Sequence, residues 1–317
     1  ERPTNARRYC FAWNTAGSPQ VIIAVVGATA TGKTSLAVAL AQEFGGEVIS
    51  ADAFQLYHGM DIGTAKVTEA EAGGIPHHQI DVLDLSQRAS VAAYQQHARE
   101  DAEAIIARGK VPVVCGGSGL YVRALLDELI FPGTDPKIRS HFQDQLEAVG
   151  SVELHKTLAT LDPLAASNIL PSNGRRVVRA LEVIQLTGRP FSATMPTGEY
   201  HYADTLQIGL RPDAEVLSSR IEKRCAQMVE QGLVEEVQAL LQKGLREAPT
   251  ARAATGYPQM IDYLDGKIDL ATATEQNALA TRKLAKKQWK WFKRDDRISW
   301  FATPDEALSF ATRALTR

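Results

Sequence analysis

Residues 27–34 have the types and the spacing of a phosphate-binding loop. Their order is Gly27-Ala28-Thr29-Ala30-Thr31-Gly32-Lys33-Thr34, which matches the pattern G-x-x-x-x-G-K-[ST]. In such a loop the glycines let backbone N–H groups converge on phosphate oxygens, and the N-terminus of the following helix adds its positive end. Lys33 would supply a positive charge to the terminal phosphate, and the Thr34 hydroxyl could coordinate Mg²⁺. The sequence therefore predicts a phosphate site without identifying the ligand.

A carboxylate at the end of a strand often completes such a site, and Asp52 is the best candidate. The apolar run Val111–Cys115 leads into Gly116–Gly119 with no carboxylate, whereas Glu47–Ala51 leads directly into Asp52. Strand ends of a parallel sheet line the ligand crevice, so Asp52 is expected near the phosphates. It could hold a metal or act as a base on an acceptor group, and the alternative is a turn or helix-capping residue.

A phosphate-binding loop needs a strand before it and a helix after it, and the sequence provides both. Val21–Val26 is apolar and rich in β-branched residues, and Ser35–Phe44 repeats its apolar residues at helical spacing. The same alternation continues with a strand at Glu47–Ile49, a helix at Ala92–Arg108 and a buried strand at Val111–Cys115. Repeated alternation of this kind predicts an α/β fold, in which a parallel sheet has helices on both faces.

The pattern changes after Phe131-Pro132-Gly133, and Lys137–Gly188 is almost wholly helical in periodicity. Leu206–Leu210 then predicts another strand, and Ala214–Lys243 and Thr272–Phe292 predict long helices. We therefore expect a flexible leader at 1–20, a P-loop NTPase-like core of parallel strands flanked by helices at 21–136 and 201–317, and an all-helical insertion domain at 137–200.

Composition limits the classes of function. Lys and Arg total 35 against 37 Asp and Glu, so the chain is not basic overall, and a polyanionic partner would need a local basic surface. No apolar run approaches the ~20 residues of a membrane span, and the leader has no apolar signal-peptide core. The 3 cysteines are far apart and lack metal-ligand spacing. We expect a cytoplasmic protein without a membrane association.

Further motifs follow the loop in an order that resembles the tRNA dimethylallyltransferases, also called tRNA isopentenyltransferases. The similarity extends from about residue 21 to residue 300. The motifs are Ser50–Tyr57, Gly59–Lys66, Pro76-His77-His78, Gly116–Tyr121, Arg176–Val183, Gly256-Tyr257 and a block from Thr281 to Phe292.

The resemblance implies an activity, a cofactor and roles for several residues. It implies transfer of a dimethylallyl group from dimethylallyl diphosphate to N6 of the adenosine that follows the tRNA anticodon, with Mg²⁺ as cofactor. The loop would then hold a diphosphate that leaves, rather than an ATP that is cleaved. Asp52 would accept a proton from the amine or orient it, and Ser118, where the family typically has Thr, would hydrogen-bond near the same centre. We expect a monomer.

The resemblance also implies binding residues on both substrates. Arg220 and Arg224 lie four residues apart on one helix face and would join the loop in binding the diphosphate, although such residues can also be solvated helix charges. The target adenosine must be extruded into a pocket. Asp52, Ala53, Phe54, Gln55 and Ser118 would form that pocket, with Gln55 reading an edge of the base.

Two basic segments could contact the anticodon stem-loop. One lies in the insertion, and the other is Thr281–Arg297, which has eight Lys or Arg residues against two Asp. On a helix, Ala285, Trp289 and Phe292 would form its apolar stripe. A solvated charged face is the alternative. The residues expected to contact tRNA are Arg139, Arg175, Arg176, Arg179, Lys283, Lys286, Lys287 and Lys290, of which Arg139 matches a family position for tRNA contact.

Other interpretations stay open at this point. An adenylate isopentenyltransferase would prenylate free AMP, ADP or ATP, but it would need neither the helical insertion nor the basic C-terminal helix. The phosphate-binding loop alone would also permit a small-molecule kinase, or a non-catalytic RNA-binding protein that senses a nucleotide. His77 and His78 could indicate a metal, but no further His, Cys or Glu is spaced to complete a site, so a structural or tRNA-backbone role is favoured.

Overall fold

The computed structural model describes residues 21–194 and 198–316, so the predicted leader at 1–20 lies outside the described residues. The chain divides into two compact units. One unit contains the chain up to Leu126 and from Tyr200 onward, and the other contains Asp127–Glu199. None of the helices in these described ranges combines the length and the apolar character that crossing a membrane requires.

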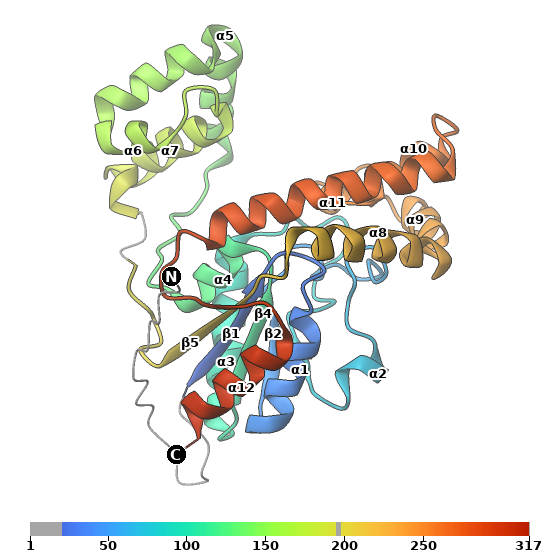
Figure 1. Cartoon of the computed structure of the whole chain (residues 1–317). Coiled ribbons are helices and arrows are strands. Elements are labelled where there is room, and N and C mark those ends of the chain that lie inside the picture. Colours follow the sequence, from blue (N-terminus) through green and yellow to red (C-terminus); the bar gives the residue numbers. More distant parts are fainter. Residues whose placement is uncertain (1–20, 195–197, 317) are drawn as a thin grey trace. The chain divides into compact units, whose positions relative to one another are not determined.

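The first unit is built on a six-stranded sheet in the order β3-β2-β4-β1-β5-β6, and its paired strands are parallel. Figure 1 shows the four central strands β2, β4, β1 and β5 side by side. Crossover helices connect the strands, as parallel pairing requires. The predicted fold class is therefore confirmed. The strands are β1 (Ile22–Gly27), β2 (Glu47–Ser50), β3 (His77–His78), β4 (Pro112–Gly116), β5 (Thr205–Leu210) and β6 (Ser299–Phe301).

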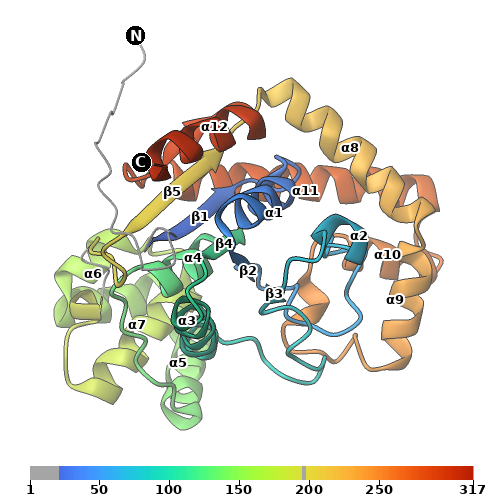
Figure 2. The same cartoon turned by 90° about the horizontal axis from the view of Figure 1, so that it is seen from below.

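Helices cover both faces of this sheet (Figure 2). On one face, α1 (Lys33–Phe44) and α12 (Pro304–Leu315) pack against each other and bury their apolar residues over β1, β4 and β5. On the other face, α3 (Val91–Ala107) packs against β2, β4 and α4 (Gly119–Leu126). The central strands β1 and β4 are buried along nearly all of their length, which explains why they are continuous apolar runs, whereas the edge strands β3 and β6 are only half-buried.

A group of helices from the C-terminal part of the chain forms a second core in the same unit. It contains α9 (Leu233–Gln242), α10 (Tyr257–Leu264) and part of α11 (Leu270–Phe292), and α8 (Ala214–Glu230) runs beside α11 (Figure 1). The prediction of one helix over Ala214–Lys243 is wrong. The helix ends at Glu230 and a new one begins after Gly232, whose φ of 103° is not helical.

The second unit is helical and consists of α5 (Pro136–Leu161), α6 (Pro163–Asn168), α7 (Gly174–Thr187) and a short 3₁₀ turn. It begins at Asp127, earlier than the insertion domain expected at 137–200. The reason is local, because the Arg179 guanidinium of α7 donates to the carbonyl oxygens of Pro132 and Gly133 at 2.6 and 3.1 Å. The segment before α5 is thereby fixed to the helices that follow it.

The buried carboxylate of Glu47 should make the fold sensitive to acid. It contacts His78 Nε2 at 2.7 Å, Arg108 at 2.7 Å and Lys110 Nζ at 2.8 Å. Burial opposes its charge, but these hydrogen bonds and cations outweigh burial and lower the pKa to about 2. Stability from this group is therefore present above its unfolded pKa of 4.5 and is lost as the pH falls through about 2.

We therefore expect Glu47→Gln to lower the free energy of unfolding by about 2 kcal/mol at neutral pH, a value reduced for the half-exposed cations. Urea unfolding of both proteins between neutral pH and about pH 3 measures the difference, which should shrink as the pH falls. The exposed Glu43→Gln on α1 is the control. A difference that stays constant with pH would contradict this assignment.

Candidate functional site

The phosphate-binding loop connects β1 to α1, as its sequence predicts. Lys33 is the first residue of α1, and its Nζ donates to the carbonyl oxygen of Ala28 at 2.6 Å. Desolvation lowers the pKa of Lys33 to about 8, an effect that Arg224 reinforces and that Cys115 and Asp52 oppose. Ala28 and Ala30 of the loop also pack against residues of α8 and α11. The loop is therefore held between the sheet and these two helices.

Asp52 lies immediately beyond β2, where the sequence places it, and it faces the same region as Lys33. Its Oδ1 accepts a hydrogen bond from Phe54 N–H at 2.9 Å. Burial raises the pKa of Asp52, while the Phe54 N–H and the charge of Lys33 act in the opposite direction. Ser118, from the loop after β4, accepts from Ala53 N–H at 3.4 Å. The ends of β2 and β4 thus bring Asp52 and Ser118 into one neighbourhood, as expected.

A cavity beside the loop combines charged and apolar surfaces. It is a cleft open to solvent rather than a sealed void in the core. Its polar lining includes Thr29, Asp52, Arg224, Asn277, Thr281 and Gln288. Its apolar lining includes Phe54, Ile221, Met228 and Leu284. The cavity can therefore bind a ligand that has an anionic end and a hydrocarbon end.

The two arginines predicted to bind diphosphate have different positions. Arg224 lines the cavity, and desolvation lowers its pKa although Cys225, Glu71 and Asp52 favour the charged form. Arg220, one turn earlier on α8, is exposed and does not line the cavity in the described part of the chain. Arg224 therefore lies at the cavity and Arg220 does not, and the diphosphate role of both arginines stays a prediction.

The structure gives Gln55 a different environment from the one expected. Its amide oxygen accepts from Ser50 Oγ at 2.8 Å, and its amide nitrogen donates to the carbonyl oxygens of Thr64 and Ala65 at 3.1 and 3.2 Å. The side chain thus connects the end of β2 to the segment after residue 60. It does not line the cavity that contains Asp52. Both ends of the Gln55 amide thus have partners within the protein, and its base-reading role stays a prediction.

Gln288 of α11 is a site residue that the sequence analysis does not identify. Its Oε1 accepts from Thr29 N–H of the phosphate-binding loop at 2.9 Å, and its side chain lines the cavity. The position lies on the same helix face as Ala285 and Phe292, which are both buried. A polar residue within that apolar stripe is the only sequence signal that could have found it.

The residues expected to contact tRNA fall into two groups. Lys283, Lys286, Lys287 and Lys290 are exposed, and their spacing places them on one face of α11. Arg175 and Arg176 are also exposed at the start of α7.

Arg139 and Arg179 instead have an internal partner. Both bind the fully buried Glu182 carboxylate, at 2.8 and 2.9 Å. These two arginines stabilise the helical unit, so their charges are less available to an outside partner than the sequence suggests.

The two histidines of Pro76-His77-His78 are both engaged with the protein. His77 Nδ1 lies 2.9 Å from the carbonyl oxygen of Ile75, and His78 Nε2 lies 2.7 Å from Glu47. His77 also lines a smaller cavity with Thr34, Ser50 and Cys115. Among residues 21–194 and 198–316, three or more His, Cys, Asp or Glu side chains do not gather anywhere as a metal site.

Comparisons with known proteins agree with this geometry. The IPP transferase family matches residues 55–295. This chain is a member of that family. The tRNA dimethylallyltransferase of Nocardia farcinica is 49% identical over 93% of this chain and 95% of its own length. That of Streptomyces coelicolor is 50% identical over 93% and 97%. The resemblance inferred from the ordered motifs is confirmed.

Solved structures of similar proteins share the fold. The tRNA isopentenylpyrophosphate transferase of Bacillus halodurans superposes with a TM-score of 0.67 at 39% identity, over 93% of this chain and 96% of that chain. A eukaryotic dimethylallyltransferase, described as acting on tRNA, gives a TM-score of 0.77 at 28% identity, over 92% and 77%. The similarity therefore covers nearly the whole chain, including the helical unit.

The lowered pKa of Lys33 predicts how pyrophosphate binding should respond to pH. Lys33 loses its charge as the pH rises through about 8, whereas an arginine at the same position stays charged. The informative quantity is the pyrophosphate affinity of the wild type divided by the pyrophosphate affinity of Lys33→Arg. Above the pKa of Lys33, this ratio should fall by up to about tenfold per pH unit. Taking this ratio cancels the ionisation of pyrophosphate itself.

Isothermal titration calorimetry from about pH 7 to about pH 9 measures the ratio. Lys243→Arg, at an exposed position after α9, is the control and should leave the affinity unchanged at every pH. A ratio of wild type to Lys33→Arg that is flat across this range would show that Lys33 keeps its charge.

Proposed function

We propose that this chain transfers a dimethylallyl group from dimethylallyl diphosphate to N6 of the adenosine next to the anticodon of tRNA. The observation that carries the proposal is the cavity, where Asp52 and Arg224 share a wall with Phe54, Ile221 and Leu284 beside the phosphate-binding loop. The anionic and hydrocarbon ends of a prenyl diphosphate match these two kinds of lining. Relatives that are about half identical over nearly the whole chain carry the name tRNA dimethylallyltransferase.

The chemistry follows from the positions of the charged groups. N6 of the adenosine attacks the first carbon of the prenyl group, the bond from that carbon to the diphosphate oxygen breaks, and the electron pair leaves with the diphosphate. Lys33, Arg224 and the loop N–H groups would stabilise the negative charge that grows on the leaving group. Asp52 would accept the N6 proton, and the raised pKa makes it a stronger base than an exposed aspartate. Ser118 would help to orient the reacting amine.

We also propose that Mg²⁺ binds with the diphosphate. Mg²⁺ keeps several waters and usually takes only one or two protein ligands together with phosphate oxygens. The exposed Thr34 hydroxyl beside Lys33 fits that requirement without a cluster of carboxylates. When bound, Mg²⁺ would supply Lewis-acid stabilisation of the departing diphosphate.

The tRNA requires a second kind of surface. The exposed lysines on one face of α11, together with Arg175 and Arg176, are proposed to contact the phosphates of the anticodon stem-loop. The target adenosine must be extruded to reach Asp52, at a cost of a few kcal/mol for unstacking. Because tRNA is the proposed substrate, we place the protein in the cytoplasm. We also propose that the protein acts as a monomer.

Incubation with radiolabelled dimethylallyl diphosphate, Mg²⁺ and unmodified tRNA tests the function. Label should appear on tRNAs that have adenosine next to the anticodon and not on tRNAs with another base there. Transfer to free AMP should be much slower, because AMP cannot use the basic face of α11. Equal rates with AMP and tRNA would favour an adenylate isopentenyltransferase, and absence of transfer to any tRNA would reject the proposal.

Replacing Asp52 should separate catalysis from tRNA binding. Asp52→Asn keeps the shape of the side chain and an acceptor for Phe54 N–H, but it loses the ability to take a proton. We expect turnover to fall by several hundredfold. Single-turnover transfer and tRNA binding by filter assay are the two measurements. The tRNA affinity should stay unchanged, as it should for the exposed control Asp84→Asn. Undiminished turnover would remove Asp52 from the mechanism.

Removing lysines from α11 should weaken tRNA binding through electrostatics. In the triple variant Lys286→Ala, Lys287→Ala and Lys290→Ala, the slope of log affinity against log salt should decrease by roughly one for each lysine that contacts a phosphate. Fluorescence anisotropy with an anticodon stem-loop at several salt concentrations measures the slope. Lys243→Ala is the matched exposed control. An unchanged slope would exclude this face from the interface.

A further inference from the structure

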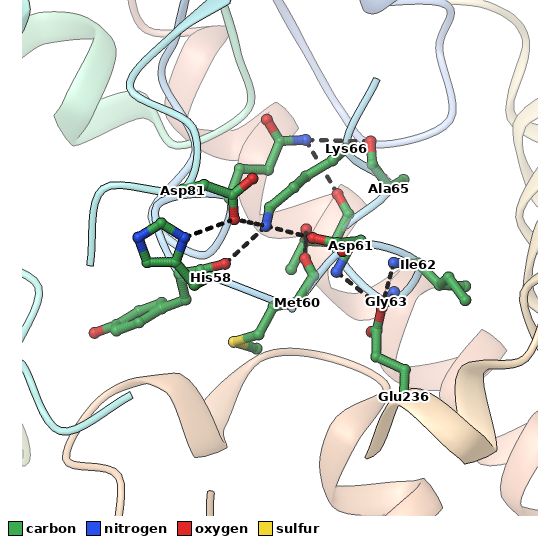
Figure 3. A network of polar contacts seen from close by, with 12 residues as sticks. His58, Met60, Asp61, Ile62, Gly63, Ala65, Lys66, Asp81 and Glu236 are labelled. Carbon is green, nitrogen blue, oxygen red and sulfur yellow. Dashed lines mark hydrogen bonds and ion pairs between the residues drawn. The ribbon is translucent and has the colours of Figure 1, made fainter. Parts of the chain in front are cut away.

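The segment Gly59–Lys66, here called the anchored loop, forms one wall of the cavity. Gly63, Thr64 and Ala65 line it alongside Asp52 and Arg224. The loop is held to the surrounding protein by Gln55 and by two charged side chains, Lys66 and Glu236 (Figure 3). Neither charged group lines the cavity. Any effect of Lys66 and Glu236 on a ligand in the cavity is therefore transmitted by the anchored loop.

Lys66 fixes the loop at its end. Its side chain is only 6% exposed, and Nζ contacts the Asp61 carboxylate at 2.6 Å and the Asp81 carboxylate at 2.5 Å. It also donates to the carbonyl oxygen of Tyr57 at 2.7 Å. These three acceptors match the three protons of the ammonium group. The ion pairs therefore join Asp61, near the start of the anchored loop, and Lys66, at its end, to Asp81 in the segment that follows.

Glu236, from the distant helix α9, fixes the middle of the loop (Figure 3). One carboxylate oxygen accepts the backbone N–H groups of Asp61 and Ile62 at 2.8 and 2.7 Å. The other oxygen accepts the N–H of Gly63 at 3.1 Å and the hydroxyl of Tyr257 at 2.7 Å. One ionised side chain thus orients three consecutive peptide groups, and hydrogen bonds to a charged acceptor are stronger than neutral ones.

The wall cannot adjust its position easily. A Cβ atom on Gly63 would lie 2.5 Å from the ring of Tyr257, so the backbone is already in close contact with that ring. Ala65 has a φ of 50°, a left-handed conformation that costs energy for any residue with a side chain. Such a conformation persists only when surrounding contacts enforce it. Of its three residues, Gly63 and Ala65 have no side chain that could change rotamer, and the Thr64 hydroxyl donates to the carbonyl oxygen of Met60.

We propose that Glu236 is a positioning residue that limits the length of the prenyl group accepted by the cavity. The inference rests on the proposed function, and it assigns the limit to the rigidity of the anchored loop. A ten-carbon prenyl diphosphate needs more room than a five-carbon one, and a wall held at Asp61, Ile62 and Gly63 does not yield to it. Loosening these anchors should therefore relax the selectivity for the prenyl donor.

Glu236→Gln tests this inference with little change in volume. The amide oxygen can replace only one of the two carboxylate oxygens, so an amide N–H must face a backbone N–H of the loop, and at least one anchor is lost. The assay compares geranyl with dimethylallyl diphosphate as donors to the same tRNA. In both reactions the carbon–oxygen bond to diphosphate breaks, a bond to N6 forms, and the N6 proton goes to Asp52.

We expect the ratio of geranyl to dimethylallyl transfer, each as kcat/KM, to rise by about fivefold or more over wild type. Glu235→Gln, at the exposed neighbouring position on α9, is the matched control and should leave the ratio unchanged. A general loss of stability would lower both rates together and would not move the ratio. Lys66→Met, which releases the loop at its other anchor, should raise the ratio as well.

The outcomes distinguish this inference from the proposed function. If wild type transfers neither prenyl group to tRNA, the proposed function fails. If wild type transfers the dimethylallyl group while Glu236→Gln and Lys66→Met both keep the wild-type ratio, the anchored loop does not set the donor length. Thermal unfolding of each variant verifies that it is folded, and a variant that does not fold leaves the other to decide the result.

Discussion

Asp52 and Arg224 line one cavity, and Lys33 of the adjacent phosphate-binding loop interacts electrostatically with both, while desolvation disfavours the charge of all three side chains. Burial lowers the pKa of Lys33 and of Arg224 and raises that of Asp52. A bound diphosphate would place negative charge beside Lys33 and Arg224, so its binding should raise the pKa of both side chains. Asp52, in contrast, would become more basic beside the bound anion. The same desolvation thus favours both anion binding and proton acceptance.

The parallel sheet explains why these groups meet. The carboxyl ends of β1, β2 and β4 lie at one edge, so the phosphate-binding loop, Asp52 and Ser118 follow adjacent strands. Such an edge is where open α/β sheets bind their ligands. The helices α8 and α11 then cover the loop and bring Arg224 and Gln288 to the same cavity. The strand ends thus position the loop that would bind the anionic end of the ligand. The helices provide most of the apolar lining for its hydrocarbon end.

The parts of the site that the sequence predicts are those determined by local patterns. The phosphate-binding loop and Asp52 are found because motif and strand end are adjacent in the chain. Gln288 is not found, since it is 259 residues from Thr29, and a stripe of lysines around it dominates the pattern. The same limit explains Arg139 and Arg179, because counting charges cannot show that both bind the buried Glu182. The break between α8 and α9 is missed because apolar periodicity continues across Gly232.

The two substrates require different kinds of protein surface. A prenyl diphosphate is small, so a fixed wall can select it by shape, and the contacts of Glu236 and Lys66 give the anchored loop the necessary rigidity. A tRNA is large and presents a repeating phosphate charge, so under the proposed function exposed lysines on flexible stems would be sufficient to bind it. If both proposals hold, donor selection by the rigid wall and tRNA binding by the exposed lysines should respond separately to mutation. A substitution that alters one of them without the other identifies the surface to which its residue belongs.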